Sequence, residues 1–157
     1  MIAVDTSVLV DYIGEGPAAE AAEEALRMAL GAGPVVACEI VVSEVVAGLG
    51  HSDVVMETLD AIGIGFSPLE LRSAVRAGEM QRRYKERIRG SSVPAQARRT
   101  VPDFLIGAHA LLQCQGLITR DAGFFRDYFK GLKVIVRCGP WCHGEVRNGG
   151  LPWQASD

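Results

Sequence analysis

Several features that define whole classes of protein are missing from this chain. Among its 157 residues, no apolar run approaches the ~18 residues needed to cross a membrane, so we expect no membrane partner. No basic segment precedes the first apolar residues, which argues against a signal peptide and favours the cytoplasm. The chain has four cysteines, too few for a disulfide scaffold at this length.

The glycine-rich signatures of nucleotide-binding proteins are also missing. No Gly-x-Gly-x-x-Gly follows the first expected strand, and there is no Walker lysine. Phosphatases of the haloacid dehalogenase type carry a second aspartate two residues after the first. Here Asp5 is followed at that position by Ser7, so the pattern does not fit.

What the chain contains is an alternation of short β-branched strands with helices, which predicts an α/β fold. We expect one domain over residues 1–137, with a mostly parallel sheet flanked by helices on both faces, and an irregular tail over residues 138–157. The expected strands are 2–4, 35–37, 63–66, 117–119 and 133–136. Ser67-Pro68-Leu69-Glu70 predicts a capping box that begins a helix extending to about Ile88.

Positive charge is concentrated in one segment, although the net charge of the chain is −3. Residues 72–99 hold nine of the sixteen basic residues against two acidic ones, a local charge of +7. Such a stripe suits contact with a phosphate backbone, and the alternative is a solvated helix face. The candidate contacts are Arg82, Arg83, Arg98 and Arg99.

Four acidic residues occupy positions where a charge needs an explanation. Asp5 and Asp121 follow expected strands, where ligands gather in open parallel sheets. Glu44 interrupts an apolar helix, and Asp103 begins another. Taken singly, Asp103 is also explained as a helix N-terminal acid and Asp121 as a loop acid.

Together, these four carboxylates would repel one another unless a cation joined them. Ligation by oxygen alone favours Mg²⁺ or Mn²⁺ over zinc. Such ions assist phosphodiester hydrolysis, so the sequence indicates a metal-dependent nuclease.

The order of these motifs resembles the PIN-domain family, and most of all the VapC toxins of type II toxin–antitoxin systems. The resemblance covers about residues 1–137 and rests on four segments, which are VDTSVLVD at Asp5, VSEVVAGL at Glu44, PDFLIGAHAL at Asp103 and LITRDAGF at Asp121. It implies a Mg²⁺- or Mn²⁺-dependent endoribonuclease that cleaves RNA, is inhibited by a cognate antitoxin, and is often a homodimer.

The resemblance also implies a role for individual residues. The metal site and catalytic carboxylates would be Asp5, Glu44, Asp103 and Asp121. Thr6 or Ser7 matches a small hydroxyl that supports substrate or metal, and Thr119 matches a hydroxyl that supports the fourth acid. This chain departs from the family where alanines are common, at Gly107 and His109.

Some alternatives remain open at this point. The same fold could serve as an RNA-binding or regulatory module that does not cleave, although retention of all four acids favours a nuclease. His109 lies six positions beyond Asp103 and points away from it, so a general-base role is disfavoured. Cys138, Cys142 and His143 offer three zinc ligands without a clear fourth. For an antitoxin, we expect a surface formed by the helix around 54–62 and the helix bearing Tyr12.

Overall fold

A five-stranded parallel sheet forms the centre of the molecule, as the sequence predicts. The computed structural model describes residues 1–90 and 99–136. The strand order is β3-β2-β1-β4-β5, and every neighbouring pair is parallel. The strands are β1 (Ile2–Val4), β2 (Val35–Ala37), β3 (Gly65–Phe66), β4 (Leu117–Thr119) and β5 (Val134–Val136).

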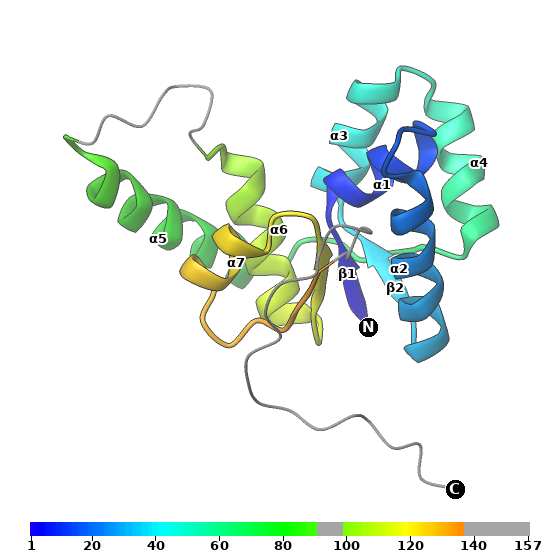
Figure 1. Ribbon diagram of the computed structural model, residues 1–157. Helices are drawn as coiled ribbons and strands as arrows, with labels where there is room; N and C mark the ends of the chain where they lie inside the picture. Colours follow the sequence, from blue (N-terminus) through cyan, green and yellow to red (C-terminus); the bar gives the residue numbers. More distant parts are fainter. Residues whose placement is uncertain (91–98, 137–157) are drawn as a thin grey trace, which may run out of the picture.

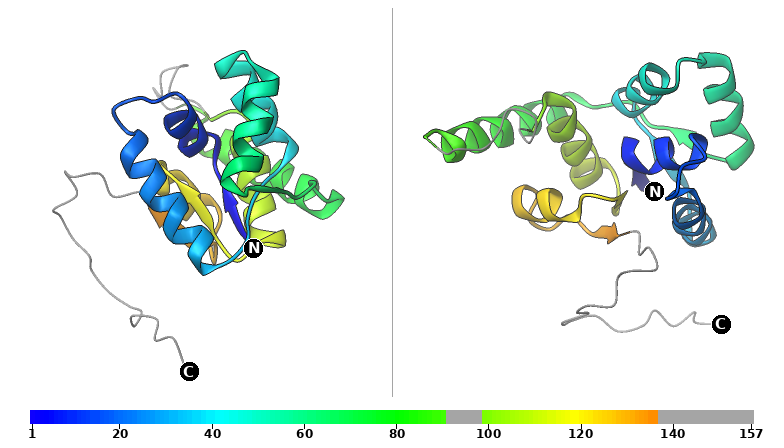
Figure 2. Two further views of the ribbon diagram at one scale, coloured as in Figure 1. Left: turned by 90° about the vertical axis from the view of Figure 1, so that its right-hand side faces the viewer. Right: turned by 45° about the horizontal axis from the view of Figure 1, so that its top comes forward.

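Helices lie on both sides of this sheet. In Figure 1, α5, α6 and α7 stand on one side of β1, and α1 to α4 on the other; the second view in Figure 2 agrees. Their bounds are α1 (Thr6–Ile13), α2 (Ala19–Ala32), α3 (Glu39–Leu49), α4 (Ser52–Ile62), α5 (Leu71–Ile88), α6 (Val101–Gln113) and α7 (Ala122–Tyr128). This is the predicted α/β fold. None of the helices in the described part is long and apolar enough to cross a membrane.

The central strands are buried on both faces, because helices cover each of them. Ala3, Val4, Leu117 and Ile118 are at most 1% exposed. Such strands are expected to be continuous apolar runs, which explains why their short sequences are recognisable. The first polar residue after β1 and the last residue of β4 therefore lie together at the carboxyl edge of the sheet.

The start of α5 differs from the prediction. The expected capping box over residues 67–70 is wrong, because the helix begins at Leu71 and Glu70 is its N-cap, without a side-chain capping bond. Ser67 instead continues from β3, where its amide donates to the Ala37 carbonyl at 3.0 Å. Its hydroxyl lies 3.0 Å from His109 Nε2. The Ser67 hydroxyl, which a capping box would need, is instead bound by the buried ring of His109.

Candidate functional site

Asp5 lies directly beyond β1 and is only 8% exposed. Two hydroxyls donate to its Oδ2, Thr119 Oγ1 at 2.6 Å and Ser7 Oγ at 2.7 Å. Thr119 ends the neighbouring strand β4, and Ser7 is in the first turn of α1. The parallel pairing of β1 with β4 is what brings residues 114 positions apart into contact.

The environment of Asp5 favours its protonated form. Burial raises the pKa of Asp5, the hydrogen bonds from Thr119 and Ser7 partly offset this, and the negative charge of Asp103 raises the pKa further. A cation bound beside Asp5 would favour the ionised carboxylate and so oppose both effects that raise its pKa.

Glu44 lies on α3 and contacts α1 through a hydroxyl. Thr6 Oγ1 donates to Glu44 Oε2 at 2.6 Å. Ser7, which donates to Asp5, directly follows Thr6, which donates to Glu44. The two carboxylates are therefore held by adjacent residues in the first turn of α1. The charge that interrupts this apolar helix is thus hydrogen-bonded to Thr6.

Asp103 closes the start of α6. Its Oδ2 accepts from the Thr100 amide at 2.7 Å and from Thr100 Oγ1 at 3.0 Å, forming a capping box with Pro102 in the first turn. Its other oxygen, Oδ1, lies 3.9 Å from Arg99 Nη1. Asp103 therefore has the helix N-terminal role that the sequence allowed, and this role uses only its Oδ2 oxygen.

Asp121 caps the start of α7. Its Oδ1 accepts from the Phe124 amide at 3.4 Å, and its own amide donates to Thr119 Oγ1 at 3.0 Å. Its Oδ2 is ion-paired with Arg99 Nη2. Thr119 therefore joins Asp5 to Asp121, and Arg99 joins Asp121 to Asp103.

The structure thus links the four acids at one end of the sheet, but it does not bring them into a single ready metal site. Within residues 1–90 and 99–136, no three His, Cys, Asp or Glu side chains are close enough together to hold an ion. The donor chemistry suits Mg²⁺ or Mn²⁺, since all four side chains offer carboxylate oxygens. The Arg99 guanidinium contacts both Asp103 and Asp121 at the place where an ion would bind them.

The candidate RNA contacts separate into two groups. Arg82 and Arg83 are exposed on α5, and Arg82 Nη1 pairs with Glu86 one turn on, at 2.8 Å from its Oε1. Arg99 is turned toward the acids. Arg98 lies outside the described residues, as do the tail, Cys138, Cys142 and His143.

His109 belongs to a second polar cluster, separate from the acids. It is 1% exposed, and burial lowers its pKa, while the charges of Glu39 and Glu70 partly raise it again. Nearby, Gln113 Nε2 donates to the Pro68 carbonyl at 2.8 Å, and its Oε1 accepts from the Glu70 amide at 3.0 Å. These contacts hold the segment between β3 and α5 onto α6, which is a structural role.

Two arginines that pair with acids near the site were missed by the sequence reasoning. Arg99 was assigned to the RNA backbone and not to the acids. Arg120 Nη1 lies 3.1 Å from both carboxylate oxygens of Asp11 on α1. For Arg99, the signal was its position directly before Thr100-x-x-Asp103, a capping pattern that places it one turn from an acid.

Comparisons with known proteins agree with this architecture. None of the curated proteins compared with the chain matches it. Among solved structures, it is similar to VapBC2 from Rickettsia felis bound to a promoter DNA fragment (TM-score 0.62, 17% identity, 87% of this chain and 98% of that chain). It is similar to DNA-bound VapBC from Salmonella typhimurium (0.63, 14%, 87% and 98%) and to a toxin–antitoxin complex from Klebsiella pneumoniae (0.58, 23%, 88% and 98%).

At these identities the likeness shows a shared fold. The sequence itself matches the PIN domain family over residues 2–130, a range that contains all four acids. The chain therefore belongs to the PIN domain family.

Proposed function

We propose that this protein is a Mg²⁺- or Mn²⁺-dependent endoribonuclease and the toxin of a toxin–antitoxin pair. The observation that carries the proposal is the chain of contacts that links Glu44, Asp5, Asp121 and Asp103 at the carboxyl edge of β1 and β4. Membership of the PIN domain family and the fold shared with toxin–antitoxin proteins support it.

In this proposal, the four carboxylates would hold the ion. A divalent ion bound there would activate water and stabilise the charge that develops during phosphodiester hydrolysis. The hydroxyls of Thr119 and Ser7 fix the orientation of Asp5, and that of Thr6 fixes Glu44. The exposed arginines Arg82 and Arg83 on α5, together with Arg98 and Arg99, would bind the RNA backbone.

The proposal is tested by incubating total RNA with the purified protein and Mg²⁺ or Mn²⁺. We expect discrete fragments that disappear with EDTA, and with Asp5→Asn or Glu44→Gln. The matched control is Glu24→Gln, which neutralises an exposed acid on α2 and should cleave like the parent. RNA that is bound but left intact by the folded, metal-loaded protein would identify a binding or regulatory module instead.

The hydroxyl that holds Glu44 gives a finer test. Thr6→Val keeps the shape of the side chain but removes the donor to Glu44 Oε2. Loss of such a supporting contact typically weakens metal binding or activity about 10- to 100-fold. Unchanged Mn²⁺ affinity and cleavage in Thr6→Val would show that the Thr6 hydroxyl is not needed to hold Glu44 for metal binding or catalysis.

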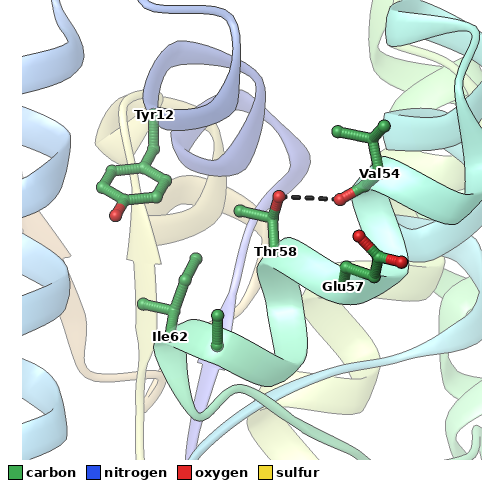
Figure 3. A pocket seen from close by; sticks show the side chains of 6 residues that line it. Tyr12, Val54, Glu57, Thr58 and Ile62 are labelled. Atoms are coloured by element: carbon green, nitrogen blue, oxygen red, sulfur yellow. Dashed lines mark hydrogen bonds between the residues drawn. The ribbon is translucent and has the colours of Figure 1, made fainter.

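An open groove offers a place for the antitoxin. It has a volume of about 560 Å³ and is lined by Tyr12 of α1 and by one face of α4 (Val54, Glu57, Thr58, Ala61 and Ile62). Figure 3 shows the Tyr12 ring facing Ile62, with the Thr58 hydroxyl turned back to the Val54 carbonyl at 2.7 Å. The groove lies on the two helices that the sequence indicated. Its lining is mostly apolar with one acid, which suits an apolar antitoxin segment carrying a basic residue.

A further inference from the structure

Arg99 makes several kinds of contact at the acidic site, whereas an ordinary surface arginine forms a single ion pair. Its Nη2 pairs with Asp121 Oδ2, and its Nη1 lies 3.9 Å from Asp103 Oδ1. Its guanidinium carbon stands 4.6 Å from the centre of the buried Phe124 ring. Its amide donates to the Tyr84 hydroxyl at 3.0 Å. The side chain is thus positioned by α6 and α7, and the backbone by α5.

The arginine pairs within single helices are of a different kind. Arg27–Glu23, Arg82–Glu86 and Arg76–Glu79 each join residues three or four positions apart on one helix, and the side chains of the first two pairs are at least half exposed. Such pairs contribute little to stability. Arg99 and Asp121 are 22 positions apart, and their side chains are 31% and 40% exposed. Arg99 therefore bridges two separate elements at a partly buried site.

The oxygens that Arg99 faces are the ones that a metal would need. Asp103 Oδ2 is occupied by the Thr100 amide and hydroxyl, and Asp121 Oδ1 by the Phe124 amide. The remaining oxygens, Asp103 Oδ1 and Asp121 Oδ2, both point to the guanidinium. A guanidinium and a divalent ion cannot occupy the same lone pairs. Two acids of the set are therefore paired with a cation, and no cluster of three metal-ligating side chains is present in the described residues.

We propose that Arg99 is the internal counter-cation of this site: it holds Asp103 and Asp121 in the metal-free protein and is displaced when a divalent ion binds. The inference rests on the proposed metal dependence, and it identifies Arg99 as the residue that competes with the ion for Asp103 and Asp121. Displacement also frees a guanidinium beside the acids, where the proposed RNA contact would be made.

The test is Mn²⁺ binding by the full chain, followed through the electron paramagnetic resonance signal of the free ion. Arg99→Gln removes the charge but retains the backbone bond to Tyr84. We expect its Kd for Mn²⁺ to fall about three- to tenfold, since the ion no longer competes with a partly buried ion pair. Arg99→Lys keeps a positive charge and should gain less. The control Arg27→Gln breaks an exposed Arg–Glu pair on α2 and should match the parent.

Thermal unfolding supplies a second reading that does not depend on activity. Without metal, Arg99→Gln should melt below the parent, because Asp103 and Asp121 lose their cation. Saturating Mn²⁺ should then raise its melting temperature by more than it raises that of the parent. Equal Mn²⁺ affinity and equal metal-induced shifts in parent and Arg99→Gln would overturn the inference and leave the nuclease proposal intact. No Mn²⁺ binding by either protein would overturn both.

Discussion

The hydroxyl of Thr119 is the residue-scale feature on which most of the site depends. It is fully buried, donates to Asp5 Oδ2 and accepts from the Asp121 amide. Thr119→Val keeps the shape of the side chain and leaves both partners short of a bond. We expect the free energy of unfolding to fall by about 1–3 kcal/mol, the usual cost of an unsatisfied buried polar group. Urea denaturation without metal measures it.

A matched control tests whether burial is the cause. Thr58→Val on α4 makes the same change where the hydroxyl is bonded to the Val54 carbonyl of its own helix, next to solvent. Its effect should stay within about 0.5 kcal/mol. Equal losses in the two variants would mean that the substitution itself, and not the contact with Asp5, destabilises the protein.

His109 should make stability depend on pH. Burial lowers its pKa in the folded protein, so below about pH 6.5 the unfolded chain takes up a proton that the folded one refuses. Stability is therefore full above that pH and falls as the pH drops toward the folded-state pKa, by at most about 1.4 kcal/mol per pH unit. Glu39 and Glu70, whose charges act on the ring, soften the effect.

Urea denaturation at pH 7.5, 6.5 and 5.5 checks this. His109→Gln should flatten the decline, because glutamine does not titrate and its amide can still meet Ser67. His51→Gln, at the exposed start of α4, should leave the decline unchanged. If the parent and His109→Gln lose stability in parallel, other groups account for the pH dependence.

At the scale of elements, α6 packs against the segment after α7 through a position without a side chain. A Cβ on Gly107 would lie 2.3 Å from Phe129 Cε2, and Phe129 is 1% exposed. This contact explains why the position holds glycine. Gly107→Ala should destabilise by about 1–3 kcal/mol through overpacking, although alanine is the better helix former.

The comparison variant is Gly78→Ala on α5, where a Cβ meets nothing within 4 Å. There the helix preference acts alone, and we expect a gain of about 0.5–1 kcal/mol. Thermal melts of both variants give the sign directly. A stabilising Gly107→Ala would show that the Phe129 ring moves aside at little cost.

Local sequence signals predicted elements well and their ends less well. The strands and helices were recognisable because buried strands are short apolar runs and helices carry a periodic apolar face. Ser67-x-x-Glu70 and Thr100-x-x-Asp103 are the same kind of capping signal, yet only the second forms a capping box. What separates them is His109, a residue more than thirty positions from Ser67 that no local pattern connects to it.

The same limit applies to the site. Asp5, Glu44, Asp103 and Asp121 stand out because a charge in an apolar context needs a partner. Which partner each one finds was not predictable locally. Thr119 meets Asp5 across 114 positions, and Arg99 meets Asp121 across 22, through sheet order and helix packing. Arg99 was consequently read as part of the basic segment around it, not as part of the acidic site.

For the whole molecule, the proposal separates two surfaces, an acidic site at the edge of β1 and β4 and a groove on α1 and α4. Ala61→Arg places a long cation in the groove without altering any of the described contacts of the acids. We expect it to abolish capture by the proposed antitoxin, measured by co-purification, while RNA cleavage stays at the parent level. Arg27→Gln, which breaks the exposed pair with Glu23 on α2, should leave antitoxin capture unchanged. Retained capture by Ala61→Arg would place the antitoxin elsewhere, and loss of cleavage together with capture would mean that groove and site are not independent.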